Sequence, residues 1–152
     1  MDNPYKDELR RELWEMCVRR DLEAFLACDW SMTAPDFQDE GFLGIDACQS
    51  RDPHDWIPKY PTLESYHQEF ERQALEFSKN EFDEDPRTAL YASLSLSDPK
   101  IDGESGLIVK TFNGSIPAGG ETIELNWQSI FQLRRYESRW LIAGFVGYLP
   151  LA

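Results

Sequence analysis

The chain has 152 residues, a length that predicts one domain over residues 1–152 that buries roughly two thirds of its unfolded surface. With 28 acidic and 15 basic residues the formal charge is −13, so a phosphate backbone or an anionic membrane would be repelled. The pairs Arg19-Arg20 and Arg134-Arg135 are too short to form a basic patch. We therefore expect no nucleic-acid partner.

The N-terminal residues, the hydropathy of the chain and its cysteines indicate where the protein is located and whether its thiols are reduced. The start, Met1 to Pro4, is not a secretory leader, and no apolar run approaches the ~18 residues needed to cross a bilayer. We expect a cytoplasmic protein without a membrane partner. Cys17, Cys28 and Cys48 are odd in number and lack metal-like spacing, which predicts reduced, mostly buried thiols.

The first part of the chain predicts helices followed by a short strand. Apolar residues at helical spacing indicate an amphipathic helix over residues 5–20, and Asp21 is a suitable N-cap for a second, short helix. Residues 41–47 are typical of a strand, and their two glycines suggest a bend or a close approach by another backbone. The Asp- and Pro-rich residues 49–61 predict a loop, which folds back because it carries Trp56.

The middle of the chain predicts one long helix and then strands. Thr62 is suited to cap a helix of about 16 residues. After an acidic linker over residues 80–87, alternation indicates a strand over residues 90–97. Another strand is expected over residues 106–112, and the Gly- and Pro-containing residues 113–120 predict the loop that follows it.

The last third predicts two long strands joined by a tight polar turn at residues 136–138. In the first strand apolar residues alternate with polar ones, as in Ile123, Leu125 and Trp127, so one face is buried and one is wet. Residues 139–150 are apolar on both faces, which is typical of an inner strand.

This order of elements resembles the nuclear-transport-factor-2-like superfamily, also called SnoaL-like or ketosteroid-isomerase-like. The resemblance rests on Arg20 to Phe25 between the first helices, on Asp36-Phe37 before the first strand, and on Arg139 to Phe145 in the last strand. It implies an α+β fold: a cone-shaped, strongly bent, mostly antiparallel sheet wrapped around a long helix, with N-terminal helices. It also implies a cavity at the wide end and a homodimer formed through the outer sheet face.

Two residues are candidates for general acid–base catalysis. The resemblance places Asp46 near the region where isomerases of the superfamily carry their base, although the isomerase pattern around that base is not reproduced here. Asp46 follows an apolar strand, so it either enters the cavity as a base or faces solvent at the strand end. His67 lies at the edge of the long helix's apolar stripe, where it either shuttles a proton or makes an ordinary hydrogen bond. His54 is either an exposed loop residue or part of a lid with Trp56.

Aromatic residues are the candidates for binding an apolar ligand. The predicted ligand-binding residues are Trp56, Tyr66, Tyr91, Trp127, Phe131 and Tyr148, although aromatic residues at such spacing also form ordinary cores. No metal site is expected, because the histidines match no signature such as HExxH.

Two functional hypotheses remain. One is a pocket protein that binds a small apolar molecule, or a protein partner. The alternative is a cofactor-independent isomerase, dehydratase or hydrolase that uses Asp46, with or without His67.

Overall fold

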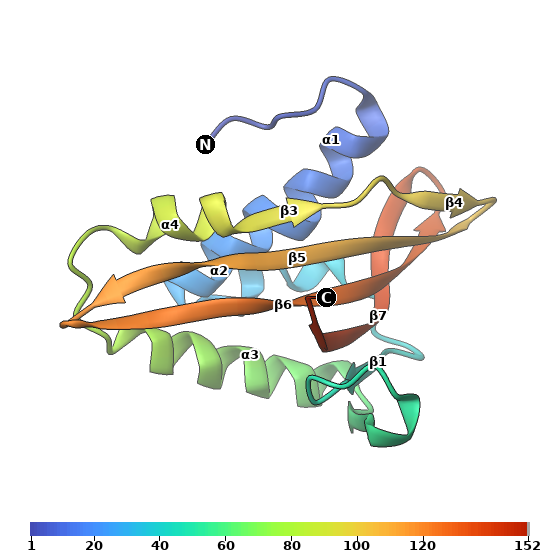
Figure 1. The fold of residues 1–152 in the computed structure, drawn as a ribbon. Coiled ribbons are helices and arrows are strands. Elements are labelled where there is room, and N and C mark those ends of the chain that lie inside the picture. Colours follow the sequence, from blue (N-terminus) through green and yellow to red (C-terminus); the bar gives the residue numbers. More distant parts are fainter. Residues whose placement is uncertain (152) are drawn as a thin grey trace.

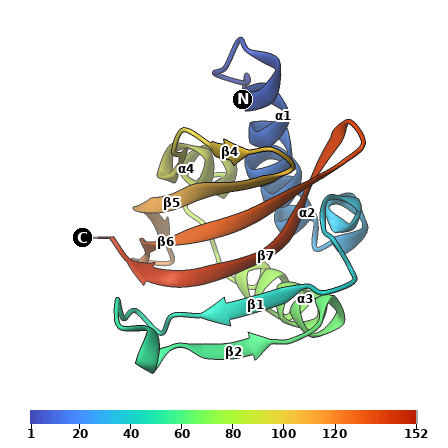
Figure 2. The same cartoon turned by 90° about the vertical axis from the view of Figure 1, so that its right-hand side faces the viewer.

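The computed structural model describes residues 1–151 as a curved sheet with helices on its concave side, drawn in Figures 1 and 2. Its longer helices are α1 (Glu8–Trp14), the π-helical η1 (Glu15–Arg20), α2 (Asp21–Ala27), α3 (Leu63–Ser78) and α4 (Pro86–Ser93). Single 3₁₀ turns occur at η2 (Trp30–Met32), η3 (Ala34–Asp36) and η4 (Pro53–Asp55). Among residues 1–151 no helix is long and apolar enough to span a membrane.

Seven strands form the sheet: β1 (Leu43–Asp46), β2 (Ile57–Tyr60), β3 (Leu94–Leu96), β4 (Lys100–Asp102), β5 (Ser105–Ala118), β6 (Glu121–Tyr136) and β7 (Arg139–Pro150). Their order is β2-β1-β7-β6-β5-β3, and β4 also pairs with β5. Among the pairs of these seven strands within residues 1–151, only β1–β7 is parallel, so the sheet is mostly antiparallel, as expected. Figure 2 shows the curvature of the sheet, with α3 beside β1 and β7.

Several predicted elements are confirmed. Thr62 caps α3. Its side-chain hydroxyl accepts a hydrogen bond from the backbone N–H of Ser65, and the Ser65 hydroxyl oxygen accepts one from the backbone N–H of Thr62. The long final hairpin forms in the predicted positions, as β6 and β7. β7 lies between β1 and β6, which explains why both of its faces are apolar.

The helix break predicted at Asp21 is wrong. Helical backbone runs without interruption from α1 through η1 into α2, and Asp21 has ordinary helical angles of −61° and −49°. Its carboxylate does not cap a helix end but pairs with Lys110 on β5. A buried ammonium needs a nearby counter-charge, and a helix cap would leave it without one.

The strand predicted over residues 90–97 is correct only at its end. Residues 86–93 form α4, with Pro86 in its first turn and Asp85 as N-cap, accepting a hydrogen bond from the backbone N–H of Arg87. An Asp-Pro pair is a helix-start signal, because Pro needs no partner for its missing N–H at that position. Only Leu94–Leu96 is a strand.

Two predicted loops contain strand structure. β5 continues through residues 113–118, and the turn is made by Gly119 and Gly120, both with positive φ. Gly114 stays within the strand because α4 passes so close that an added Cβ would lie 2.9 Å from the Cβ of Ser93. The predicted loop over residues 49–61 ends in β2, which pairs with β1.

The prediction of mostly buried thiols is correct for one of the three cysteines. Cys17 is buried, whereas Cys28 and Cys48 are exposed. Both exposed cysteines have positive φ, Cys28 at the end of α2 and Cys48 in the turn after β1.

The core consists of two buried clusters on the concave side of the sheet. One packs the N-terminal helices and α3 against β7, and includes Leu13, Phe70 and Phe145. The other packs them and α4 against the far ends of β5 and β6, and includes Leu22 and Ile116. The space between these clusters is not fully filled, and it is the site described next.

Candidate functional site

A cavity of about 480 Å³ lies between the concave face of the sheet and helices α2 and α3. Its volume falls within the usual range of small-molecule sites, roughly 300–1,000 Å³. Aromatic residues are the most frequent kind in its wall, with Phe25, Phe70 and Phe77 from the helices and Phe112, Trp127 and Phe131 from the sheet. Polar groups of this wall include one on β5 and one between α3 and β7, and Glu76, Asn80, Glu124 and Ser129 also line the cavity.

The polar group on β5 is the ammonium of Lys110, which lines the cavity although its side chain is only 1% exposed. Its Nζ donates a hydrogen bond of 2.7 Å to Oδ2 of Asp21, which also lines the cavity. The same Nζ lies 5.0 Å from the ring centroid of Phe112 and 5.9 Å from that of Phe131. A carboxylate and two ring faces therefore compensate the buried charge.

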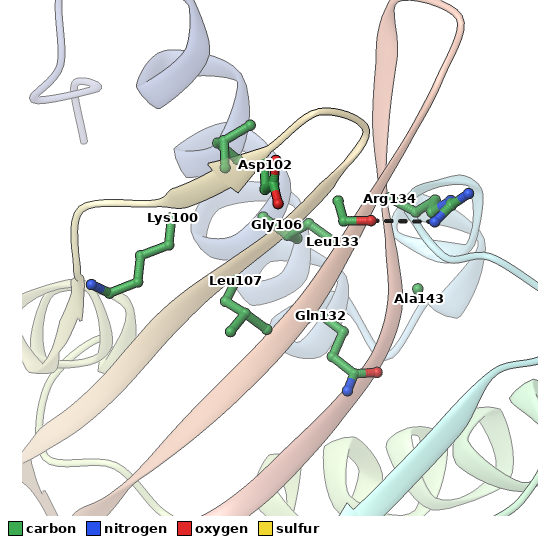
Figure 3. A pocket seen from close by; sticks show the side chains of 10 residues that line it. Lys100, Asp102, Gly106, Leu107, Gln132, Leu133, Arg134 and Ala143 are labelled. Carbon is green, nitrogen blue, oxygen red and sulfur yellow. Dashed lines mark hydrogen bonds between the residues drawn. The ribbon is translucent and has the colours of Figure 1, made fainter.

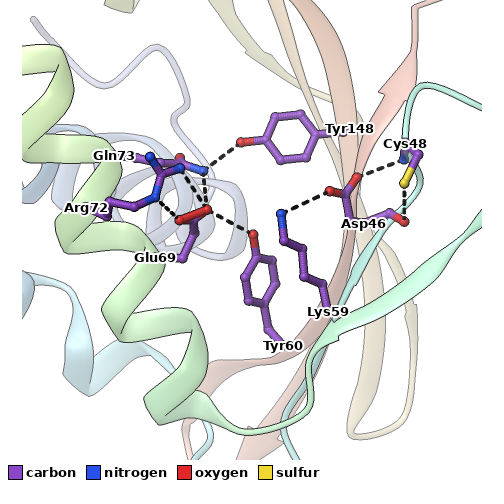
Figure 4. Close-up of polar contacts among 8 residues, drawn as sticks. All are labelled: Asp46, Cys48, Lys59, Tyr60, Glu69, Arg72, Gln73 and Tyr148. Atoms are coloured by element: carbon purple, nitrogen blue, oxygen red, sulfur yellow. Dashed lines mark hydrogen bonds and ion pairs between the residues drawn. The ribbon is translucent and has the colours of Figure 1, made fainter.

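The second polar group is a network between α3, β2 and β7, drawn in Figure 4. Glu69 accepts hydrogen bonds from Arg72, from the hydroxyl of Tyr60 at 3.3 Å and from the amide of Gln73 at 3.4 Å. Gln73 also donates a hydrogen bond of 3.0 Å to the hydroxyl oxygen of Tyr148. Because Tyr148 accepts in this contact, its own O–H remains available as a donor.

Tyrosine hydroxyls of the cavity remain protonated. Burial raises the pKa of Tyr66 well above its usual range, and burial raises the pKa values of Tyr60 and Tyr148 as well. In the neighbouring network, the hydrogen bond from Arg72 lowers the pKa of Glu69. The network therefore combines an ionised acceptor with neutral hydroxyl groups.

A β-bulge directs Tyr148 into the cavity. Opposite Ser129 of β6, β7 carries two residues, Gly147 and Tyr148, and the pairing shifts there. Tyr148 has a φ of 57°, an unusual conformation for a bulky side chain. Bulges of this kind re-aim a side chain and occur next to functional sites. Here the ring of Tyr148 lies 5.4 Å from that of Trp127.

Four of the six predicted ligand-binding residues line this cavity: Tyr66, Trp127, Phe131 and Tyr148. The other two lie elsewhere. Tyr91 packs on Trp14 in the second core cluster and donates a hydrogen bond to Glu23. Trp56 lies in the folded-back loop, where its indole N–H donates 2.9 Å to the carbonyl of Ser50.

Asp46 and His67 lie outside the cavity wall and are not brought together. At the end of β1, Asp46 accepts 2.8 Å from the backbone N–H of Cys48 and lies 3.9 Å from Nζ of Lys59. His67 is on α3, where its ring stacks on Trp30 at 5.0 Å between two glutamates of the same helix. The loop residue His54 is exposed and contacts Asp52.

Sequence reasoning missed Lys110 and Asp21. One signal was available, because Lys110 alternates with Ile108 and Phe112 and so belongs to the buried face of its strand. Asp21 gave no such signal, since its partner is 89 residues away. Across residues 1–151, no three His, Cys, Asp or Glu side chains gather in a way that would hold a metal ion.

The outer face of the sheet carries a second, shallower depression, drawn in Figure 3. Ile101, Leu107 and Ala143 form its apolar part, and Lys100 and Arg134 are among its charged residues. Leu107 and Ile101 are large apolar side chains that are exposed to solvent. This face is therefore apolar at its centre and charged at its edges.

No family model and no curated protein matches the sequence, but solved structures match the fold. An NTF2-like protein of unknown function from Shewanella oneidensis MR-1 has a TM-score of 0.57 at 9% identity, covering 90% of this chain and 95% of that chain. An NTF2-like protein with a cystatin-like fold from Novosphingobium aromaticivorans has a TM-score of 0.56 at 12% identity, with 92% and 80% covered. An NTF2-like protein from Cytophaga hutchinsonii has a TM-score of 0.52 at 11% identity, with 95% and 99% covered.

Proposed function

Because this chain has the NTF2-like fold and encloses an aromatic cavity, we propose that it binds a small, flat, apolar molecule between the sheet and α2 and α3. The observation that carries this proposal is the cavity itself, a space of about 480 Å³ whose wall combines many aromatic side chains with polar and charged ones. Sites for small molecules have this composition, in which apolar walls supply affinity and the polar groups fix orientation.

The aromatic wall favours a flat molecule. Phe112 and Trp127 stack with their ring centroids 4.6 Å apart and their planes inclined by 21°, and Tyr148 continues this surface. A planar ring system can pack against such a surface with offset stacking, which adds about 0.5–1.5 kcal/mol per ring pair to the burial of apolar area.

Acid–base catalysis by Asp46 and His67 is not part of this proposal. The two residues lie on different elements, and neither belongs to the wall of the cavity. A general base must lie within hydrogen-bond reach of the proton that it removes from a bound substrate.

Binding is tested with 2-ethylnaphthalene, a flat apolar probe, by equilibrium dialysis. We expect saturable binding to the wild-type protein with a stoichiometry of one per chain. Ser129→Leu adds side-chain volume inside the cavity and should weaken binding about tenfold or more. Asn126→Leu, a matched change on the exposed face of the same strand, should not. Absence of saturable binding to naphthalene-sized probes of any kind would refute the proposal.

The proposed protein partner is a second copy of this chain, paired through the outer face of the sheet. Exposed Leu107 and Ile101 support this pairing, because apolar side chains on an open sheet face are stabilised by burial. The arrangement leaves the cavity free, since the cavity opens on the opposite side of the sheet.

A further inference from the structure

The charge balance of the cavity wall restricts what can bind there. Five charged side chains line the cavity: two cations, Arg72 and Lys110, and three anions, Asp21, Glu76 and Glu124. Arg72 is already paired with Glu69, and Lys110 with Asp21. The chain as a whole carries a formal charge of −13. No cation of the wall is therefore left uncompensated for an anionic ligand.

Two side chains of the cavity wall, by contrast, have hydrogen-bond donors without an acceptor oxygen or nitrogen in the part of the chain that the structure describes. An ammonium has three N–H donors, and within residues 1–151 Lys110 uses one of them, toward Asp21. Its other contacts are the ring faces of Phe112 and Phe131, which are weak acceptors. The Tyr148 hydroxyl, which accepts from Gln73, keeps its O–H free to donate. These two donors favour a ligand that accepts hydrogen bonds.

Resting on the proposed function, we propose that the ligand is an uncharged aromatic carbonyl compound whose oxygen accepts a hydrogen bond from Lys110 of the Lys110–Asp21 pair. A carbonyl oxygen satisfies a buried donor without adding charge to the pair. A carboxylate in the same place would bring a second anion next to Asp21, at a desolvation cost that one shared ammonium does not offset. A hydrocarbon would leave the donors unmatched.

Three probes of one shape test this assignment in the wild-type protein: 2-acetylnaphthalene, 2-ethylnaphthalene and 2-naphthoate, measured by equilibrium dialysis at neutral pH. We expect the ketone to bind about tenfold more tightly than the hydrocarbon, the value of about one hydrogen bond. Naphthoate should bind more weakly than the ketone, by a factor of about ten or more. Equal or tighter binding of naphthoate would overturn the inference.

A variant shows whether the Lys110–Asp21 pair sets this order. Asp21→Asn keeps the shape and one acceptor oxygen but leaves the ammonium without its counter-charge, so naphthoate should now bind more tightly than the ketone. Asp98→Asn is the matched control, because it also removes one carboxylate by the same change but lies outside the cavity wall, in an exposed pair with Arg10. It should leave the order unchanged. An unchanged order in a folded Asp21→Asn protein, checked by thermal unfolding, would also overturn the inference.

Failure of this inference is distinguishable from failure of the proposed function. If the hydrocarbon and the ketone bind with equal affinity, the cavity binds apolar molecules but Lys110 does not select a carbonyl. If none of the three probes binds, the proposed function itself is refuted. If Asp21→Asn does not fold, the order of the three probes in the wild-type protein still decides the question.

Discussion

Oδ1 of Asp36 accepts a hydrogen bond of 2.6 Å from Nη2 of Arg139, across 103 residues of sequence. Arg20 binds the same carboxylate from the other side, through contacts of 2.7 and 3.0 Å. Asp36 itself is 1% exposed. This cluster joins the end of η1, the turn η3 and the start of β7, the three segments on which the expectation of an NTF2-like fold rested. Those motifs therefore meet at one structural point.

Replacing Asp36 should destabilise the fold. Asp36→Ala removes the shared acceptor of both arginines, and we expect a loss of about 2–3 kcal/mol in the free energy of unfolding, measured with urea. Asp98→Ala, which breaks the exposed pair with Arg10, should cost less than about 1 kcal/mol. Equal losses in the two variants would contradict a structural role for the cluster.

The Glu69 network should make stability depend on pH. The hydrogen bond from Arg72 lowers the pKa of Glu69 below its ordinary value of 4.5. The unfolded chain therefore takes up the proton first as pH falls, and the contribution of Glu69 is present above pH 4.5 and lost as pH falls through the folded pKa. Glu69→Gln should be about 1 kcal/mol less stable than wild type at pH 7, and this difference should shrink below pH 4.5.

The same urea titrations supply the control for this prediction. Glu76→Gln alters an exposed glutamate of the same helix and should be nearly neutral across the pH range. A Glu69→Gln difference that stayed constant, or grew, toward acid pH would contradict the assignment.

Two of the three thiols should react in the native protein. Burial raises the pKa of Cys17 to about 12, and its side chain is enclosed in the core, whereas Cys28 and Cys48 are exposed. N-ethylmaleimide at pH 8 should therefore add two labels per chain, and a third only in denaturant. Mass spectrometry of the intact protein counts the labels, and peptide mapping assigns them. Three labels on the native protein would show that the first core cluster opens readily.

Pairing through the outer sheet face predicts a definite mass. Sedimentation equilibrium at micromolar concentration should give about twice the chain mass of 17.7 kDa. Leu107→Glu should reduce it to that of one chain, because it places a charge at the centre of the proposed interface. Leu75→Glu, at a more exposed leucine on α3, should leave the mass unchanged. A wild-type mass near 17.7 kDa would refute the dimer.

Much of the fold was predictable because its signals are local. Alternation from Ile123 to Leu133 predicts β6, apolar residues on both faces predict the inner position of β7, and Thr62 marks the start of α3. Each signal depends on residues a few positions apart, whose geometry is set by the period of a strand or a helix. The aromatic residues of β6 were placed on the cavity side for the same reason.

Only the tertiary structure decided where the charged groups of the site belong. Asp21 is a suitable helix cap by its local sequence, yet it lies inside a continuous helix because Lys110 is buried opposite it. Asn113-Gly114 is a turn signal, yet the pairing of β5 with β6 overrides it. A strand's period determines which face a side chain occupies, but the environment of that face depends on segments far away in the sequence. The sequence by itself thus determined the final hairpin of β6 and β7 and the start of α3, and the packing of α2 against β5 decided the chemistry of the cavity.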